Sequence, residues 1–394
     1  MPIGVFVLAV AVFAQGTSEF MMSGLLAATA ADFDVSLGTV GLLTSVYAVG
    51  MVLGAPTMAA TAGRWPLRRS ATTFLALFAL AHVAAAVTTD FPVLVGTRVL
   101  AAVANAGFLA TVLAALPGLV GPALIGRATA VVVSGVTVAC VAGVPAGTLL
   151  GQEWGWRSAF WAVAVVSAVV LVPVAVLVPR DGAGDRTRGR SMRSEWAVLG
   201  LREVRVAVLA GVLVNAATFA AFTYLGAVTA RTTGAESRWI PAVLALFGLG
   251  SFAGVTLSGR YGDRHGRAII AAGTAGSVGA WALAAVTAHT IAGLATMTLV
   301  TGAVAFGVGS ALIATIVRTA APTAPRLAGA LATTALNIGA VLGPIAAGVV
   351  VDAAGTPVAA LWCASAAAAL AAAVVLGDRV RHGRADVTVR VEAH

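Results

Sequence analysis

The sequence predicts an all-α membrane protein in which twelve transmembrane helices form two pseudo-symmetric six-helix halves around a central cavity. The prediction rests on an apolar composition, on twelve long apolar runs, and on the placement of arginines between these runs. Of the 394 residues, 60% are hydrophobic and only 10% are charged, and the mean hydropathy is +0.99. A soluble domain is nearer half apolar and a quarter charged, so these runs require a lipid bilayer as their medium.

A membrane helix needs about 20 consecutive, mostly apolar residues. Division of the chain at its polar, Pro and Gly punctuation gives twelve runs near that length. The predicted spans are residues 4–29, 37–61, 71–88, 92–116, 127–150, 158–178, 206–229, 239–258, 268–288, 291–317, 327–351 and 357–377. The N-terminus lacks a basic stretch and a cleavage site, so we expect the first span to be a retained helix rather than a signal peptide.

The arginines gather on one side of these spans, as basic residues do in cytoplasmic loops. One set of loops is rich in arginine, whereas the opposite loops carry only Arg157, Arg231 and Arg238. The alternation predicts that both termini and the central loop are cytoplasmic. The net charge of +9 is spread between apolar runs instead of forming one basic domain, so we expect no nucleic-acid partner.

Polar residues inside the spans follow a period of three helices. Spans three, six, nine and twelve contain no charged residue, and span ten carries only Thr and Ser. The strongest polar groups, in spans one, four and seven, are Gln15, Glu19, Arg98, Asn105, Asn215 and Tyr224. The period predicts that spans one, four, seven and ten line the central cavity and that spans three, six, nine and twelve face lipid.

The two halves also echo each other in sequence. The stretch "AGVPAGTLLG" (142–151) is matched by "LGPIAAGVV" (342–350), and "GRWPLRR" (63–69) by "GRYGDRHGR" (259–267), each six spans later. Two parallel six-helix units are typical of one class of transporter. The predicted division is 1–178 for the first bundle, 179–205 for a cytoplasmic linker, 206–377 for the second bundle and 378–394 for a cytoplasmic tail.

Several stretches resemble the major facilitator superfamily, and within it the twelve-span drug:proton antiporters. "GRYGDRHGR" is similar to the superfamily's loop motif, at Gly259, Asp263, Arg264, Gly266 and Arg267. The first-half copy departs from it, with Gly63 in place of the Asp. "GVPAG" (143–147) and "LVGTR", ending in Arg98, are similar to antiporter motifs, although Ala101 and Ala102 replace the usual Gln-Gly. "FAQGTSEFM" and "ANAGFLA" resemble actinobacterial chloramphenicol-resistance exporters.

The resemblance implies a monomeric transporter of the bacterial plasma membrane that needs no cofactor and is driven by the proton gradient. It implies export of a small amphiphilic antibiotic, chloramphenicol or a related drug, by alternating access. Related sugar-efflux transporters share several of these stretches, so a sugar or metabolite exporter of the same fold is the alternative.

Other function classes lack the residues that they need. A chain without lysine has no Walker A motif, which argues against ATP as the energy source. The sequence has neither the intramembrane acid pairs or His clusters of an enzyme nor the charge rings of a channel. Cys140 and Cys363 lie in apolar runs and predict no disulfide or metal site. His82, His265 and His289 show no ligand spacing, and no role is assigned to them.

Glu19 is the only acid well inside a span, roughly 18 Å from the outer end of span one at 1.5 Å per residue. A central charge costs about 2.5–3.5 kcal/mol for Asp, so we expect Glu19 to face a cavity. A carboxyl group in a cavity of low polarity can exchange protons near neutral pH, which suits a proton-coupling residue. The alternative is a structural carboxylate that Thr17, Ser18 or a neighbouring helix holds by hydrogen bonds.

Arg98 is the only basic residue well inside a span. Since a guanidinium keeps its proton, it needs backbone carbonyls, water or Glu19 as a partner. We predict that Arg98 acts with Glu19 in proton coupling by responding to the proton occupancy of the carboxylate. The alternative is a clamp that only packs helices.

A cavity of aromatic and amide groups fits a small neutral drug, with flexible methionine as an adaptable wall. Span seven places an amide and two aromatic rings at i, i+4 and i+7, on one helical face. The predicted substrate-binding residues are Gln15, Phe20, Met22, Tyr47, Asn105, Asn215, Phe219, Phe222 and Asn337. For each aromatic alone, packing or lipid contact is the alternative.

Two sets of residues predict gates. Proline removes a backbone donor and glycine lets helices approach closely. We expect such residues to seal one side of the cavity in span five (Gly143, Pro145, Gly147) and span eleven (Gly343, Pro344). In the predicted cytoplasmic turn at 259–267, Asp263 and its neighbouring arginines are expected to form a charge relay that holds the inward-closed state. The alternatives are ordinary helix packing and positive-inside topology.

Overall fold

The computed structural model describes residues 1–61, 65–178, 196–234, 238–324 and 327–392. Within these ranges the regular elements are all helical. Twelve helical segments are long and apolar enough to cross a membrane, which confirms the predicted number of spans. In lipid, the hydrogen bonds of the backbone have to be made within the chain, and helices make them within each span.

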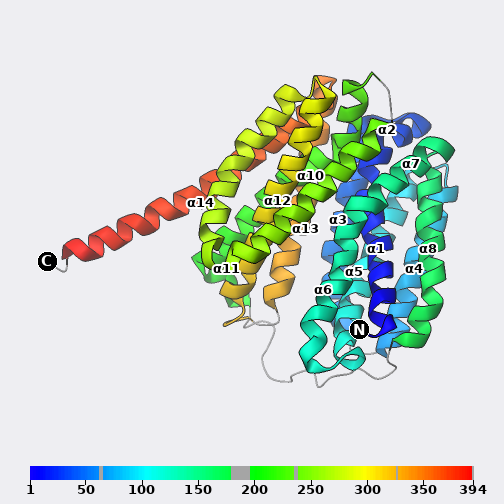
Figure 1. Ribbon diagram of the computed structural model, residues 1–394, viewed down its shortest axis with the longest axis horizontal. Coiled ribbons are helices and arrows are strands. Elements are labelled where there is room, and N and C mark those ends of the chain that lie inside the picture. Colours follow the sequence, from blue (N-terminus) through cyan, green and yellow to red (C-terminus); the bar gives the residue numbers. More distant parts are fainter. Residues whose placement is uncertain (62–64, 179–195, 235–237, 325–326, 393–394) are drawn as a thin grey trace.

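The described chain forms two bundles (Figure 1). The first contains α1 (Ile3–Phe20), α2 (Met22–Phe33), α3 (Leu37–Thr61), α4 (Leu67–Val87), α5 (Phe91–Leu119), η1 (Pro122–Leu124), α6 (Ile125–Val138), η2 (Ala139–Gly143), α7 (Val144–Trp154) and α8 (Arg157–Leu177). The second contains η3 (Trp196–Gly200), α10 (Arg202–Thr232), α11 (Trp239–Thr287), α12 (Ile291–Ala320), α13 (Leu327–Ala354) and α14 (Ala359–Glu392). Residues 179–195, most of the predicted linker, lie outside the described ranges.

Two spans that the sequence predicts as continuous helices are interrupted. Span one is broken between α1 and α2 at Met21. Span five is α6, a π-helical turn η2 and α7, because the extra residue of a π turn interrupts the regular i→i−4 bonding. Both interruptions lie near the polar residues of span one, since α1 packs directly against η2 through Gly16.

Two other segments are more helical than predicted. The backbone is helical throughout α11, including 259–267, where the sequence predicts a short turn. Its two spans are Trp239–Gly262 and Arg264–Thr287. These spans lie side by side, as shown by Phe247 and Trp281, one from each span, which line the same small cavity. The predicted tail is also helical, since α14 continues to Glu392 and extends away from the bundles (Figure 1).

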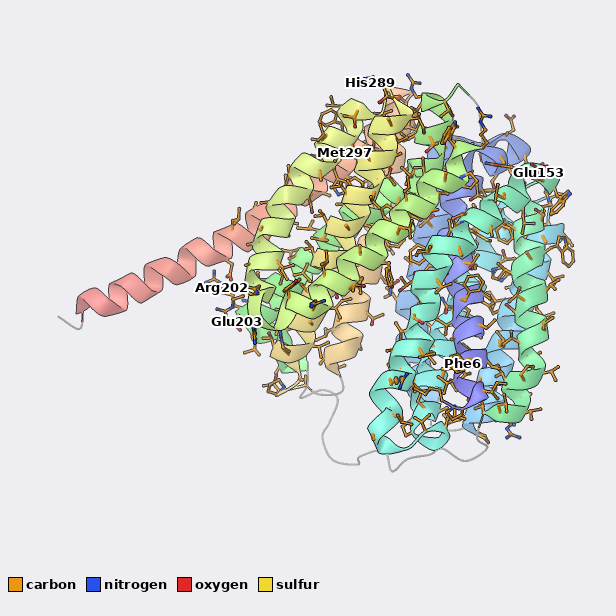
Figure 2. The ribbon with its side chains drawn as sticks, in the orientation of Figure 1. Phe6, Glu153, Arg202, Glu203, His289 and Met297 are labelled. Atoms are coloured by element: carbon orange, nitrogen blue, oxygen red, sulfur yellow. The ribbon has the colours of Figure 1, made fainter. Side chains whose placement is uncertain are left out.

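Charged side chains mark the ends of the spans. Figure 2 shows Glu153 at the end of α7 and Arg202 and Glu203 at the start of α10. Apolar Phe6, on the flank of α1, is 51% exposed, as expected for a side chain in contact with lipid. The predicted order of exposure holds for spans one and seven, which are 61% and 72% buried, against span six at 33%, although span two is as buried as span one at 61%. It fails for span ten, which at 44% is less buried than span twelve at 50%.

Matching glycine pairs reveal the repeat in three dimensions. Gly50 and Gly54 of α3 touch α5 at Val99 and Val103, too closely to leave room for a Cβ. The corresponding residues of the second half lie 200 positions later and make the same contacts. They are Gly250 and Gly254 of α11, which touch α12 at Leu299 and Ala303. The internal symmetry predicted from sequence therefore extends to individual helix contacts.

The two halves meet at one end of the molecule. We name the end at which α2 gives way to α3 the far end, and the end at which α8 stops and α10 starts the linker end. At the far end the Asp352 carboxylate of α13 accepts hydrogen bonds from Ser36 Oγ (2.7 Å) and Gly38 N (3.1 Å), at the start of α3. Deeper, Ser45 Oγ donates to Val341 O at 2.9 Å. The bundles lean together at the far end and stand apart at the linker end (Figure 1).

Replacing Gly226 by Ala is expected to open the far end. Gly226 of α10 packs against the backbone oxygen of Ser23 in the opposite half, and a Cβ would overlap that oxygen. Overpacking of this kind costs about 1–3 kcal/mol, which shifts a two-state equilibrium roughly 5- to 150-fold. Distances between spin labels on Ala31 and Ala353, in a chain whose native cysteines are replaced by Ser, report the opening.

The matched control is Gly276→Ala in α11, where a Cβ meets nothing within 4 Å. This variant should keep the wild-type distance distribution. A Gly226→Ala variant with that same distribution would show that the Gly226 contact does not hold the far end closed.

Candidate proton and substrate site

The break in span one exposes backbone groups at the point where the polar residues lie. α1 ends with Ser18, Glu19 and Phe20, and α2 begins two residues later at Met22. Carbonyl groups in the last turn of a helix lack partners within that helix. The Ser18 carbonyl instead accepts a hydrogen bond from Arg98 Nη2 of α5, at 2.9 Å.

Arg98 is held by a serine and an aromatic ring rather than by a carboxylate. Its Nη1 donates to Ser18 Oγ at 2.8 Å, so the two ends of the guanidinium bind two oxygens of one residue. Its Cζ lies 4.3 Å from the centre of the Tyr47 ring, in a cation–π contact. Only 1% of Arg98 is exposed; these contacts satisfy both terminal nitrogens, whereas Nε has no hydrogen-bond partner among the described residues.

Tyr47 of α3 contacts Arg98, and Asn105 of α5 in turn contacts Tyr47. Asn105 Nδ2 donates to the Tyr47 hydroxyl at 3.0 Å, and both residues are buried. The sequence predicted both as substrate-binding residues. The structure shows the two side chains bonded to each other.

His82 of α4 is a member of this site that the sequence did not indicate. Its Nε2 lies 2.6 Å from Ser18 Oγ and its Nδ1 lies 2.7 Å from Phe78 O. The side chain is fully enclosed, with the Phe78 ring 4.2 Å away between centres. We name Ser18, Tyr47, His82, Arg98 and Asn105 the polar cluster.

Glu19 lies beside the polar cluster and is half-buried. No ion pair within 4.0 Å joins Glu19 to Arg98 in the part of the chain that the structure describes. The two charges are still close enough to interact through space. Arg98 therefore lies close to Glu19 without a direct ion pair. Its hydrogen bonds go to Ser18, the residue that precedes Glu19 in the chain.

Phe20 joins the first half to a set of aromatic rings in the second. Its ring stacks on Phe219 with centres 5.7 Å apart and meets Phe222 edge-on at 5.8 Å. Phe222 in turn lies 4.8 Å from Phe247 of α11. We name Phe20, Phe219, Phe222 and Phe247 the aromatic cluster; it brings together three of the predicted substrate-binding residues and adds Phe247.

The repeat places these two clusters at corresponding positions. At an offset of 200 residues, Tyr47 corresponds to Phe247 and Arg98 to Thr298. In α1 and α10 the matching contacts of Gly135 and Gly339 give an offset of 203, which pairs Glu19 with Phe222. The ionisable groups thus come from the first half, and the aromatic rings come mainly from the second. The polar cluster and the aromatic cluster adjoin at Glu19 and Phe20, which are consecutive residues of α1.

The remaining predicted substrate-binding residues differ in how they are satisfied. The amide of Gln15 is buried and both of its polar atoms lack a hydrogen-bond partner among the described residues. Asn215 Nδ2 donates to Leu336 O at 2.6 Å and Asn337 Nδ2 to Thr333 O at 3.0 Å, while Met22 is buried against the core. An unpaired buried amide costs about 1–3 kcal/mol, so Gln15 is the residue best suited to gain a ligand.

The glycines predicted to seal the cavity make contacts within each half. A Cβ on Gly143 of η2 would overlap the Thr17 hydroxyl of α1, and one on Gly147 would lie 3.8 Å from Met21. In the second half Gly343 packs in the same way on Ala216 of α10. These glycines, with the neighbouring buried Pro145 and Pro344, brace the spans that carry the site.

Contacts between the halves lie next to these glycines rather than on them. A Cβ on Gly248 of α11 would lie 2.5 Å from the Cys140 carbonyl of η2. One on Gly348 of α13 would lie 3.1 Å from Gly38 of α3. The halves therefore touch at Gly248, which no sequence motif marked, and at Gly348, which lies inside the stretch 342–350 but was not among the predicted gating residues.

The predicted charge relay at 259–267 is only partly described. The side chain of Asp263 lies outside the described part of the structure, and Arg264 is exposed. Gly259 has open space around its Cα, and Gly266 lies beside the guanidinium of Arg318.

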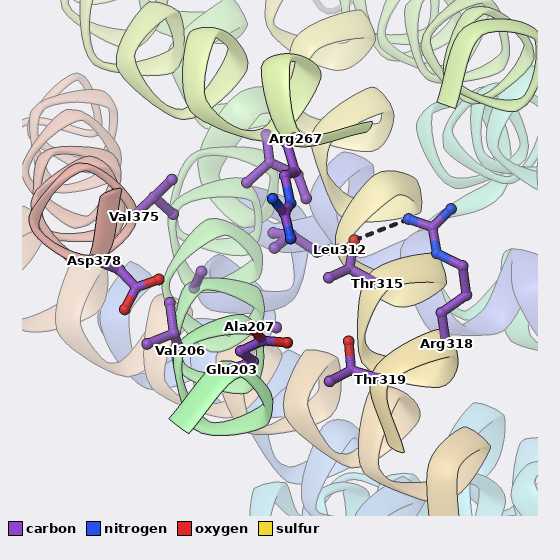
Figure 3. A pocket seen from close by; sticks show the side chains of 12 residues that line it. Glu203, Val206, Ala207, Arg267, Leu312, Thr315, Arg318, Thr319, Val375 and Asp378 are labelled. Carbon is purple, nitrogen blue, oxygen red and sulfur yellow. Dashed lines mark hydrogen bonds between the residues drawn. The ribbon is translucent and has the colours of Figure 1, made fainter. Parts of the chain in front are cut away.

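Arg267 reaches a cavity of about 590 Å³ at the linker end of the second half (Figure 3). Four helices wall this cavity, and Figure 3 shows Arg267 and Arg318 on one side of it and Glu203 and Asp378 on another. Asp378 forms an ion pair with Arg202 at 2.8 Å. The predicted gating arginine thus lies among charges from three other helices.

A family model described as Major Facilitator Superfamily matches residues 8–327. The chain is 49% identical to the chloramphenicol resistance protein of Streptomyces lividans, with 88% of each chain covered. It is 34% identical to the inner membrane transport protein YdhP of Escherichia coli, with the same coverage, and 29% identical to a chloramphenicol efflux pump of Mycobacterium tuberculosis, covering 88% of this chain and 85% of the pump.

Two solved structures share the fold at low sequence identity. A bacterial homolog of the human lysosomal transporter Spinster, in an inward-facing and unoccupied conformation, matches with a TM-score of 0.77 and 16% identity, over 94% of this chain and 95% of the other. The nucleoside transporter NupG matches with a TM-score of 0.79 and 12% identity, over 95% and 98% of the two chains.

Proposed function

Because this chain belongs to the Major Facilitator Superfamily, we propose that it exports a small amphiphilic antibiotic, chloramphenicol or a related drug, in exchange for protons. The names of its relatives in Streptomyces lividans and Mycobacterium tuberculosis support this substrate class. In this proposal the protein lies in the bacterial plasma membrane as a monomer, with both termini in the cytoplasm, and the proton gradient is its only energy source.

The observation that supports the proposal most is the adjacency of Glu19 and Phe20 at the break in span one. Phe20 lies within the aromatic cluster, which offers apolar surface to a nitroaromatic or similar ring. Glu19, the next residue along the chain, offers a group that can gain or lose a proton. A drug bound on Phe20 therefore lies next to Glu19, so drug binding and protonation of Glu19 disfavour each other. Gln15, one helical turn earlier, can form hydrogen bonds with a polar group of the drug.

The exchange follows from this competition. With the linker end toward the cytoplasm, the far end is closed and the drug enters from the cytoplasmic side as Glu19 gives up its proton. The halves then rock about the site, the contacts of Asp352 with Ser36 and Gly38 separate, and the drug leaves as a proton from outside returns to Glu19. The returning protonated carrier completes the cycle without a bound nucleotide or metal.

Resistance of a susceptible bacterial host tests the substrate class. Cells that express the chain are grown with a panel of antibiotics, and the uptake of labelled chloramphenicol is measured with and without a protonophore. We expect raised resistance to chloramphenicol or a relative, and lower drug accumulation that the protonophore abolishes.

Absence of resistance to every drug of the panel would contradict drug export. The same cells loaded with labelled sugars then test the alternative, because a sugar exporter lowers sugar accumulation while leaving drug accumulation unchanged.

A further inference from the structure

Ser18 lies at the centre of a hydrogen-bond chain whose directions can be assigned. A carbonyl oxygen only accepts, so the contact of His82 Nδ1 with Phe78 O requires the hydrogen to be on Nδ1. In a neutral imidazole Nε2 then accepts, and its partner at 2.6 Å is the Ser18 hydroxyl. The lone pairs of Ser18 Oγ are left to accept from Arg98 Nη1 at 2.8 Å.

This chain of bonds has one direction, from Arg98 through Ser18 to His82. Along this chain Arg98 Nη1, the Ser18 hydroxyl and His82 Nδ1 each donate to an acceptor, while Arg98 Nε has no hydrogen-bond partner among the described residues. Ser18 is 0% exposed and His82 and Arg98 are each 1% exposed. The Tyr47 hydroxyl also lies within hydrogen-bonding reach of Ser18. Loss of the acceptor on His82 would free the Ser18 hydrogen to turn toward Tyr47 and toward the side that now binds the guanidinium.

We propose that His82 is a positioning residue for proton exchange: it orients the Ser18 hydroxyl so that Arg98 stays bonded to Ser18 and leaves the Glu19 carboxylate free to take up and release protons. The inference rests on the proposed function. It adds a residue of α4, a span that was expected to face lipid, to the coupling machinery of α1 and α5.

The surroundings of the cluster define where a released guanidinium can go. The titratable groups close to the guanidinium are Glu19 from α1, Tyr47 from α3 and His82 from α4. Cys140 of η2 lies close to Glu19, and the Phe160 ring of α8 lies 5.9 Å from Arg98 Cζ. Glu19 is the only anionic acceptor in this set. A guanidinium freed from Ser18 therefore pairs with Glu19, and an ion pair competes with protonation.

Three variants test the assignment in proteoliposomes, with drug export measured as a function of pH. Ser18→Ala removes the central hydroxyl. His82→Asn keeps a group near the Nδ1 position for Phe78 but has nothing at Nε2. His82→Gln places an amide oxygen near the Nε2 position, where it can accept from Ser18.

We expect Ser18→Ala and His82→Asn to move the pH of half-maximal export toward acid by about one unit, a tenfold change in proton concentration. His82→Gln should restore the wild-type profile, and the double variant Ser18→Ala/His82→Asn should shift no further than either single change. The KM for drug should stay within about twofold, since the aromatic cluster is untouched.

A wild-type pH profile for Ser18→Ala overturns the inference, since that variant removes the hydroxyl without disturbing His82. Additive shifts in the double variant also overturn it, because they would mean that the two residues act separately. If the wild-type protein shows no pH-dependent export, the proposed function itself fails, and that outcome is distinct from either of these.

Discussion

Replacement of Glu19 by Gln is expected to abolish the drug gradient that a pH gradient builds, while drug exchange across the membrane continues. Glutamine keeps the size of Glu but carries no exchangeable proton, so drug and proton no longer compete at this position and loading with drug no longer depends on pH. One pH unit corresponds to about 1.4 kcal/mol for each proton exchanged, which sustains about a tenfold ratio of drug concentrations. For the Gln variant the expected ratio falls to that of protein-free vesicles.

Proteoliposomes with a one-unit pH gradient and labelled chloramphenicol measure the ratio, and counterflow between drug-loaded and drug-free sides measures exchange. Glu153→Gln, at the exposed end of α7, is the matched control and should behave as wild type. Undiminished accumulation by the Glu19→Gln protein would show that protons are carried elsewhere. Loss of exchange together with accumulation would show that Glu19 serves drug binding.

Replacement of Arg98 by Lys is expected to lower proton-driven export roughly 10- to 100-fold even though the positive charge remains. The guanidinium bonds the hydroxyl and the carbonyl of Ser18 with two different nitrogens, and it lies over the Tyr47 ring. A single ammonium group cannot reproduce this fork. A hydrogen bond to a charged group contributes about 1.5–3 kcal/mol, which sets the size of the effect.

Export is measured in the same vesicles, and the melting temperature of the purified protein shows whether the fold is retained. Arg231→Lys, an exposed position in the last turn of α10, serves as the control and should change neither quantity. Full export by Arg98→Lys would mean that the charge alone matters and that the geometry around Ser18 is dispensable.

The fold could be predicted from the sequence because its strongest determinants are local. Twelve apolar runs of membrane length are visible in any window, and the spacing of arginines and glycine motifs gives the two-half arrangement. The breaks at Met21 and at Ala139–Gly143 could not be predicted in this way. They depend on contacts such as Gly16 against Ala139, whose partners lie more than a hundred residues away.

The site was predictable only where a residue conflicts with its surroundings. Glu19 and Arg98 could be predicted as site residues because a charged side chain inside lipid has a high free-energy cost. Ser18 and His82 are 64 positions apart, and neither is charged, so no periodicity connects them. The only indication in the sequence was His82, a histidine in the otherwise uncharged span three. Because span three was expected to face lipid, no role was assigned to this residue.

The division of the site between the halves has a consequence for how such a protein evolves. Under the proposed function the two halves have different tasks: the first carries the groups that would respond to protons, and the second supplies most of the rings that would touch the drug. Selection by a new antibiotic can therefore remodel Phe219 or Phe247 while the energy-converting residues stay intact. Phe20 is the exception, because it adjoins Glu19, and lineages that diverge in drug spectrum should vary there least.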